Sequence, residues 1–212
     1  MDTVVPDIPF PRTERKLPVI LSTDEVLRIL SSITSLKYRA ILMIAYAAGL
    51  RLAEVINLKV SDIDSARMVI RIQQGKGRKD RYVMLSPTLL TILRRYWHAA
   101  RPTFWLFPSR VPGQPISDSA IQKACQRAAR DAGLTKDVTV RMLRHCFATH
   151  LLEAGANIRL IQTLLGHHSV HTTERYTHVS IDTVCATPSP LDLLALPAEV
   201  ASDEPPSWVG NR

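Results

Sequence analysis

Residues 141–179, RMLRHCFATHLLEAGANIRLIQTLLGHHSVHTTERYTHV, constrain this chain more than any other stretch. The stretch has helical periodicity, yet it carries two closely spaced arginines, several histidines and a tyrosine, which a plain hydrophobic core does not need. Arg141 and Arg144 lie three residues apart, so on a helix they share one face and form a paired guanidinium surface. Such a surface suits a phosphate, and we therefore expect an anionic ligand.

The other apolar patterns predict a mainly α-helical fold with one small antiparallel β-sheet. A capping box from Ser22 to Glu25 opens a helix that runs to about residue 31, and a second, mostly apolar helix over residues 36–48 ends at Gly49. Residues 68–72 and 81–85 have strand character and flank QQGKGRKD, whose glycines permit a turn, so a basic hairpin is expected. Further helices are expected over residues 87–100, 117–132, 141–154, 158–165 and 172–176, with Gly166 as a C-cap.

Proline usage divides the chain into three parts. Residues 1–20 contain four prolines and lack helical or strand periodicity, so we expect an extended, linker-like lead-in. Residues 21–185 form the expected folded domain, and residues 186–212 form a proline-rich tail. The tail contains one apolar patch, LDLLAL at 191–196, for which two interpretations stay open: a segment that docks on another surface, or part of a disordered tail.

Composition restricts the class of partner and the compartment. The 212 residues include 27 Lys and Arg against 19 Asp and Glu, a surplus that favours a polyanionic partner such as a nucleic acid, although many basic proteins bind none. Three widely spaced cysteines without a C-x-x-C motif support neither disulfides nor zinc and suit a reducing cytoplasm. With no H-E-x-x-H motif and no long apolar stretch, we expect no metal, no cofactor and no membrane segment.

Two further groups have ordinary structural interpretations. His145 and His150 are expected to be helix-packing residues, because no metal-binding pattern surrounds them. The apolar run from Trp105 to Phe107 is expected to lie in the core, and we favour this over a platform on which bases stack.

Four separated pieces of the sequence together resemble the tyrosine recombinase/integrase catalytic domain of the phage integrase family, in its Xer-like form. They are GLRLAE at 49–54, GKG at 75–77, LRH and FATH within 143–150, and LGH at 165–167 followed by Tyr176. The resemblance covers residues 21–179, and the order of the pieces is as specific as their content. It implies the catalytic-domain fold of that family and a DNA recombinase or integrase that works without metal or cofactor.

The resemblance also assigns roles to the most reactive side chains. Tyr176 would be the nucleophile that attacks phosphorus and forms a 3′-phosphotyrosyl bond. Arg51 and Arg144 would clamp the non-bridging oxygens of the scissile phosphate. Cleavage and rejoining would then need no external energy, because the phosphodiester bond is exchanged for a covalent link to the protein.

Further positions match the residues that assist this chemistry in the family. Lys76 would protonate the leaving 5′-oxygen, with Lys79 as its nearest rival for that role. His167 would donate a hydrogen bond to the scissile phosphate and help to orient the tyrosine. Glu54, one helical turn after Arg51, matches a supporting residue that does not itself react.

The chain departs from the family pattern at Arg141, because the family usually has histidine three residues before the second arginine. A histidine can accept the tyrosine proton near neutral pH, whereas a guanidinium stays protonated and can only donate hydrogen bonds or act through its charge. Arg141 therefore occupies a catalytic position without being able to serve as the general base. Loss of a proton acceptor typically costs about 10²- to 10⁴-fold in rate, so we expect slowed cleavage and not abolished cleavage.

A second departure concerns length. Family members commonly place a helical core-binding domain before the catalytic one, and only about 20 residues precede the resemblance here, so we expect a fragment, a naturally short version or the product of a truncated gene. The favoured interpretation is a recombinase that acts with other protomers on DNA. Two alternatives stay open: a non-catalytic DNA-binding remnant and, less favoured, a type IB topoisomerase.

Overall fold

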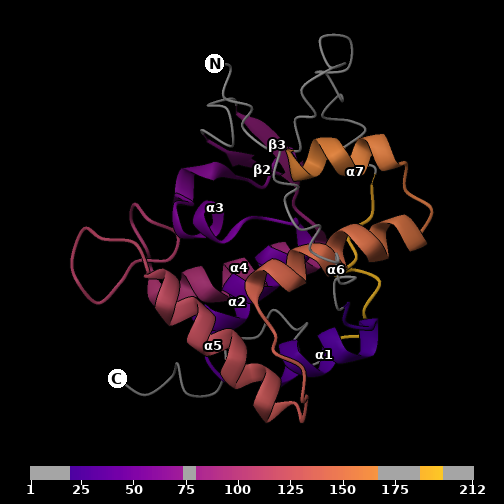
Figure 1. The fold of residues 1–212 in the computed structure, drawn as a ribbon. Helices are drawn as coiled ribbons and strands as arrows, with labels where there is room; N and C mark the ends of the chain where they lie inside the picture. The colour runs from indigo at the N-terminus through magenta and orange to yellow at the C-terminus, as the bar shows by residue number, and fades with distance from the viewer. Residues whose placement is uncertain (1–19, 74–79, 167–186, 198–212) are drawn as a thin grey trace, which may run out of the picture.

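The computed structural model describes residues 20–73, 80–166 and 187–197. Within these ranges the chain is mainly helical and includes one small antiparallel sheet, which confirms the predicted fold class (Figure 1). The elements are α1 (Thr23–Ser32), α2 (Leu36–Ala47), α3 (Leu52–Ile56), the 3-10 helix η1 (Val60–Asp62), β1 (Ile63–Asp64), β2 (Val69–Ile72), β3 (Arg81–Met84), α4 (Pro87–Ala100), α5 (Asp118–Asp131), α6 (Val140–Glu153) and α7 (Ile158–Leu165).

Side-chain caps explain where several of these helices begin. Ser22 Oγ accepts a hydrogen bond from the Glu25 amide at 3.1 Å, and the Glu25 carboxylate accepts one from the Ser22 amide at 2.9 Å, as the capping box predicted. Ser86 caps α4, whose first residue is proline. Pro87 lacks an amide hydrogen, but the first amides of a helix have no carbonyl partner within it, so no hydrogen bond is lost. These local signals are strong enough to be detected in the sequence alone.

Helix α2 lies at the centre of the core and contacts α4, α6, α5 and α1. After the polar residues of its first turn the helix is apolar on nearly all sides, and its residues from Ala40 to Ala47 are fully buried. The chain then turns at Gly49, which has a φ of +61°. A Cβ atom at this position would lie 2.4 Å from Cδ1 of Phe147, so only glycine lets α6 approach this closely. The close approach places the Gly49 carbonyl within hydrogen-bond distance of Arg144 on α6.

The sheet has the order β1-β2-β3, with Ile70 opposite Val83 in the β2–β3 hairpin. Both of these residues are buried, so one face of the hairpin belongs to the core. Figure 1 shows β3 beside α7, and the two elements are in contact. The expected hairpin is therefore confirmed, whereas its turn, residues 74–79, lies outside the described residues.

Most expected elements are present, and the exceptions are short. Helices α4 and α7 have the predicted bounds, and the left-handed conformation of Gly166, with a φ of +60°, confirms it as a C-cap. The predicted helix over residues 172–176 lies outside the described residues. Leu106 and Phe107 are buried, as expected for core residues, while Trp105 is partly exposed. Elements α3, η1 and β1 were not predicted, because runs of two to five residues carry little periodic signal.

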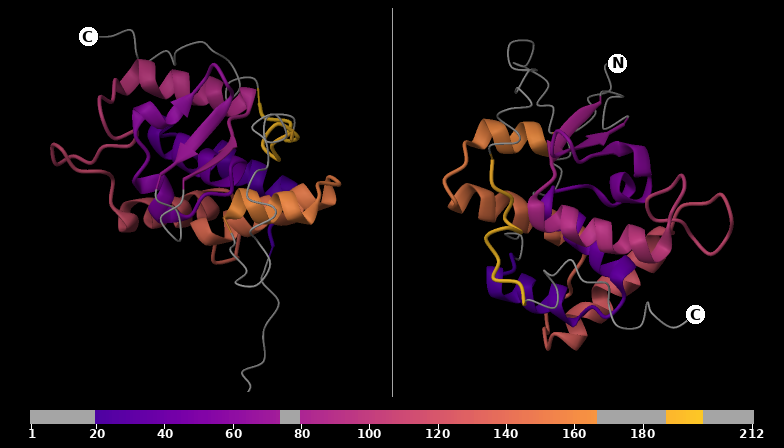
Figure 2. Two further views of the ribbon diagram at one scale, coloured as in Figure 1. Left: turned by 90° about the horizontal axis from the view of Figure 1, so that it is seen from above. Right: turned by 180° about the vertical axis from the view of Figure 1, so that it is seen from behind.

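The apolar patch of the tail packs against the same chain. Leu191 is fully buried, and the Ser189 hydroxyl donates a hydrogen bond of 2.8 Å to the carbonyl of Ala47 at the end of α2. In Figure 2 this segment runs from the side of α6 towards α1. Leu193, in contrast, leaves 58% of its surface exposed. The patch thus places Leu191 in the core, packs Leu194 and Leu196 partly buried against it, and leaves Leu193 in contact with solvent.

Candidate active site

The candidate site is built around Glu54, in the first turn of α3. The chain leaves the Gly49 turn in an extended conformation at Arg51, which precedes the helix. The Arg51 amide donates a hydrogen bond of 2.8 Å to Glu54 Oε2, so the carboxylate closes the first turn of the helix. Only 9% of the Glu54 side chain is exposed, and a carboxylate buried to this degree needs positive partners.

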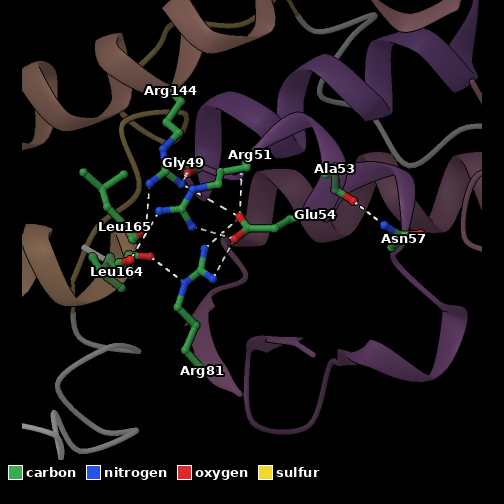
Figure 3. Close-up of polar contacts among 10 residues, drawn as sticks. Gly49, Arg51, Ala53, Glu54, Asn57, Arg81, Arg144, Leu164 and Leu165 are labelled. Carbon is green, nitrogen blue, oxygen red and sulfur yellow. Dashed lines mark hydrogen bonds and ion pairs between the residues drawn. The ribbon is translucent and has the colours of Figure 1, made fainter. Parts of the chain in front are cut away.

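Three arginines from three separate parts of the chain supply those partners (Figure 3). Arg51 Nη1 lies 2.9 Å from Glu54 Oε1, and Arg81 of β3 makes two parallel contacts of 2.9 and 2.8 Å to the two carboxylate oxygens. Arg144 Nη1 of α6 is 3.8 Å from Glu54 Oε2. We call these four residues the arginine cluster. The cluster carries three positive charges and one negative charge, which favours the approach of an anion.

The same arginines bind the C-terminal end of α7. Arg81 Nε donates to the carbonyl of Leu164 at 3.0 Å, Arg144 Nη2 to that of Leu165 at 2.6 Å, and Arg51 Nη2 to that of Gly166 at 3.2 Å. The last carbonyls of a helix lack partners within it and form the negative end of its dipole, so guanidinium groups are favourable there. Three consecutive carbonyls are thus each paired with one arginine, and this fixes where the chain leaves α7.

Arg144 is the most deeply buried arginine of the cluster, with 9% of its side chain exposed. Its Nη1 also donates to the carbonyl of Gly49 at 2.6 Å, so the tight turn after α2 orients the guanidinium. Burial lowers the pKa of Arg144 to about 10, and the positive charges of Arg51 and Arg81 act in the same direction while Glu54 opposes them. The group therefore stays protonated at neutral pH.

The Glu54 carboxyl stays ionised for the opposite reason. Burial by itself would raise its pKa, but the hydrogen bonds and charge of Arg81, together with the hydrogen bonds from Arg51, lower the pKa below its ordinary value. An ionised Glu54 keeps the three guanidinium groups close together despite their mutual repulsion.

The structure brings together some of the residues that the sequence predicted. Arg51, Arg144 and the supporting residue Glu54 meet in the arginine cluster. Lys76, its rival Lys79, His167 and Tyr176 lie outside the described residues.

Arg141 and Arg144 do not form the paired surface expected from their spacing. Arg141 is exposed on α6, whereas Arg144 is buried, and the charges that shift the pKa of Arg144 come from the cluster. The side chain that Arg141 does affect is His145, one turn further along α6, whose pKa is lowered by partial burial and then by the charges of Arg141 and Arg144. Residues three apart share a helix face only broadly, and here the boundary of the core falls between them.

The sequence-based interpretation missed Arg81. One signal was available: Arg81 and Val83 point to the same face of a strand, and Val83 is a core residue, so a charged side chain lies at an inward position. A charge at such a position needs a buried partner. The partner, Glu54, is 27 residues away in the chain, and no local pattern connects the two.

The two histidines expected to pack between helices differ. His150 is buried; its Nδ1 lies 2.9 Å from the hydroxyl of Tyr46, and its Nε2 lies 2.9 Å from the carbonyl of Leu21, which confirms the prediction. His145 is exposed, so for this residue the prediction was wrong. Its place on the outer face of α6 explains the difference, because only one side of that helix contacts the core.

Other kinds of site receive no support from the described residues. In ranges 20–73, 80–166 and 187–197, no group of three or more His, Cys, Asp or Glu side chains is arranged to hold a metal ion. No helix in the same ranges is long and apolar enough to cross a bilayer. Cys125 and Cys146 are buried free thiols, and burial, helped by Asp137, raises the pKa of Cys125 to about 12, which makes this thiol a poor nucleophile.

Comparison with known proteins places this geometry in a family. Residues 20–182 match the phage integrase family. A protein of Sinorhizobium fredii strain NGR234 named as an integrase/recombinase, y4qK, is 52% identical over 201 residues, which cover 95% of this chain and 65% of that protein. The crystal structure of XerA recombinase has a TM-score of 0.68 and 34% identity, and the match covers 82% of this chain and 64% of XerA. XerH recombinase bound to its difH substrate has a TM-score of 0.62 and 30% identity, with 79% of this chain and 52% of XerH covered. The chain spans slightly less than two thirds of y4qK and XerA, and it belongs to the phage integrase family.

Proposed function

We propose that this chain is the catalytic domain of a site-specific DNA recombinase, which cleaves and rejoins DNA through a 3′-phosphotyrosyl intermediate. The observation that carries this proposal is the arginine cluster, in which Arg51 and Arg144 of a phage integrase family chain meet around one ionised carboxylate. A phosphodiester carries one negative charge, and the excess positive charge of the cluster suits it.

Arg51 and Arg144 would both bind the scissile phosphate. The Arg51 side chain is 30% exposed and that of Arg144 is 9% exposed, so Arg51 is the more accessible of the two to DNA. Within the described residues, the contacts of the Arg51 guanidinium to Glu54 and Gly166 engage two of its five N–H donors. The others can bind the non-bridging oxygens as their charge increases in the transition state.

The remaining steps fall to residues outside the described ranges, Tyr176, Lys76 and His167. The Tyr176 oxygen attacks phosphorus and loses its proton, the bond from phosphorus to the 5′-oxygen breaks, and Lys76 donates a proton to the departing 5′-oxygen, which leaves as a 5′-hydroxyl. His167 donates a hydrogen bond to a non-bridging oxygen. In rejoining, a 5′-hydroxyl gives its proton to Lys76 and attacks phosphorus, the bond from phosphorus to the Tyr176 oxygen breaks, and the released phenolate takes a proton from water.

Removal of the tyrosine proton is the step in which this chain would differ from its family. Arg141 stands where a histidine is usual, and its guanidinium is exposed and cannot accept a proton at neutral pH. The proton would pass to water, and Arg141 would act only through its positive charge. Cleavage would therefore be slower than with a histidine at this position and would not be abolished.

The recombinase would act on DNA together with further protomers, in the cytoplasm. The ligand is double-stranded DNA, in keeping with XerH, whose structure contains its difH substrate. Strand exchange requires cleavages on two duplexes, so other recombinase protomers would act beside this one on DNA. The free, buried thiols of Cys125 and Cys146 suit a reducing cytoplasm.

A nicked suicide substrate library tests the proposal. Cleavage of such a substrate releases a short fragment, so the protein stays covalently attached, and the attached DNA can be sequenced. We expect an adduct with the wild-type chain and none with Tyr176→Phe. If the wild type forms no more adduct than Tyr176→Phe, the chain is a non-catalytic DNA-binding remnant. Relaxation of supercoiled DNA without any preferred sequence would indicate topoisomerase activity instead.

A further inference from the structure

We propose that Arg81 is a positioning residue of this site: it holds Glu54 and the end of α7 in the arrangement that lets Arg51 and Arg144 bind the same phosphate. This inference rests on the proposed function and deepens it. Arg81 is expected to act through the protein and not to touch DNA, because both Nη atoms bind the Glu54 carboxylate and Nε binds the Leu164 carbonyl.

The first support is the contact of Arg81 with Glu54. Both Nη atoms of Arg81 bind the carboxylate, one to each oxygen, at 2.9 and 2.8 Å. A bidentate pair fixes the plane of the carboxylate, whereas a single contact leaves it free to rotate. The same two oxygens accept hydrogen bonds from the side chain and the amide of Arg51. Arg81 thereby sets the direction in which Glu54 holds Arg51.

The second support is the contact of Arg81 with the end of α7. Arg81 Nε donates to the Leu164 carbonyl, and a Cβ atom on Gly166 would lie 3.3 Å from both Cδ and Nε of Arg81. The arginine side chain therefore lies directly against the Gly166 backbone, whose carbonyl accepts from Arg51 Nη2. Both described partners of the Arg51 guanidinium, Glu54 and Gly166, are thus in contact with Arg81.

The chemistry of the contacts requires arginine at this position. The planar guanidinium of Arg81 donates three hydrogen bonds in two directions: both Nη atoms point toward Glu54, and Nε points toward the Leu164 carbonyl. A lysine carries a single ammonium on a flexible stem and cannot reproduce this fork. Arg81→Lys should therefore keep the charge but lose part of the alignment, and Arg81→Gln should lose both.

The test compares two suicide substrates, one with an ordinary scissile phosphodiester and one with an uncharged methylphosphonate at the same position. Single-turnover adduct formation and DNA affinity are measured for the wild type, Arg81→Gln and Arg81→Lys. Arg71→Gln is the matched control, because Arg71 lies on the neighbouring strand β2 and also pairs with a buried carboxylate, that of Asp62, at 3.3 Å. Melting temperatures report whether each variant folds.

We expect Arg81→Gln to slow adduct formation on the phosphodiester about 10- to 100-fold, because small misplacements of a clamp cost this much. DNA affinity should change less than about threefold, since the residue does not contact DNA. The loss should shrink on the methylphosphonate, which carries no charge for the clamp to neutralise. Arg81→Lys should lie between the wild type and Arg81→Gln, and Arg71→Gln should show no difference between the two substrates.

A double variant adds a second readout. If Arg81 acts through Glu54, then Arg81→Gln combined with Glu54→Gln should be little slower than the slower single variant. The positioning role would be overturned if the rate losses of the two single variants multiplied in the double variant, or if Arg81→Gln slowed cleavage equally on both substrates. A folded Arg81→Lys that cleaves at the wild-type rate would also overturn it. This last comparison still decides the question if Arg81→Gln does not fold. Absence of any adduct with the wild type is a distinct outcome that removes the proposed function and this inference with it.

Discussion

Gly49 and Phe147 are packed so closely that a Cβ atom at residue 49 would lie 2.4 Å from the phenylalanine ring. Gly49 also has a φ of +61°, which side-chain-bearing residues rarely adopt. Its carbonyl accepts from Arg144, so a substitution here affects the core and the arginine cluster together.

Gly49→Ala should therefore lower the free energy of unfolding by about 2–4 kcal/mol, through overpacking added to backbone strain. Urea denaturation measures the loss. Gly133→Ala is the matched control, because Gly133 has a φ of +73° and nothing within 4 Å of its Cβ position, so it reports the strain alone at about 1–2 kcal/mol. Equal losses at the two glycines would show that the ring contact does not limit this site.

Glu54 predicts a dependence of stability on pH. Its folded-state pKa lies below the ordinary value of 4.5 because Arg81 and Arg51 outweigh the effect of burial. A depressed folded-state pKa means that the stabilisation is fully present above the unfolded-state pKa and is lost as pH falls through the folded-state pKa. The difference in unfolding free energy between the wild type and Glu54→Gln should thus be constant from about pH 6 to 7 and shrink below about pH 4.5. Urea titrations at several pH values measure it, and a difference that grows on acidification would contradict the assignment.

The difference between local and long-range information explains what the sequence could predict. Signals such as the Ser22 cap and Pro87 at the first position of α4 act on their own helix, so α1 and α4 were located from neighbouring residues alone. Arg51 and Arg144 were identified through motif order. Arg81 was not identified, because its role depends on contacts with Glu54 and Leu164, which lie 27 and 83 positions away in the chain. The boundary between buried Arg144 and exposed Arg141 likewise depends on how α6 packs.

The tail offers a prediction about stability. Leu191 is fully buried, so Leu191→Ala should lower the free energy of unfolding by about 2–5 kcal/mol. Leu193→Ala, two residues away and 58% exposed, should change it by less than about 0.5 kcal/mol. Thermal or urea denaturation of both variants measures the contrast. If Leu191→Ala unfolds like the wild type, the tail does not pack against its own chain in solution.

Arg144 and Arg51 should differ in what their loss does to the protein. Arg144→Ala removes the partner of two backbone carbonyls, those of Gly49 and Leu165, and should reduce both stability and adduct formation. Arg51→Ala removes a more exposed group and should reduce adduct formation about 10²- to 10³-fold with a smaller loss of stability. Suicide-substrate cleavage and urea denaturation, measured side by side, separate the two effects. Equal destabilisation by the two variants would contradict the difference in their burial.

Arg141 provides a prediction in which activity should increase. Arg141→His places a proton acceptor at the exposed position on α6 where the family usually has one, and adduct formation should accelerate by about 10²-fold or more near neutral pH. The acceleration should disappear at acidic pH, because a protonated imidazole accepts no proton. Arg141→Lys is the control, since it keeps a positive charge and adds no acceptor. If lysine and histidine accelerate cleavage equally, relief of a guanidinium-specific contact and not proton transfer explains the gain. An unchanged rate with histidine would mean that water already removes the tyrosine proton fast enough, and that the substitution of the usual histidine costs this chain nothing.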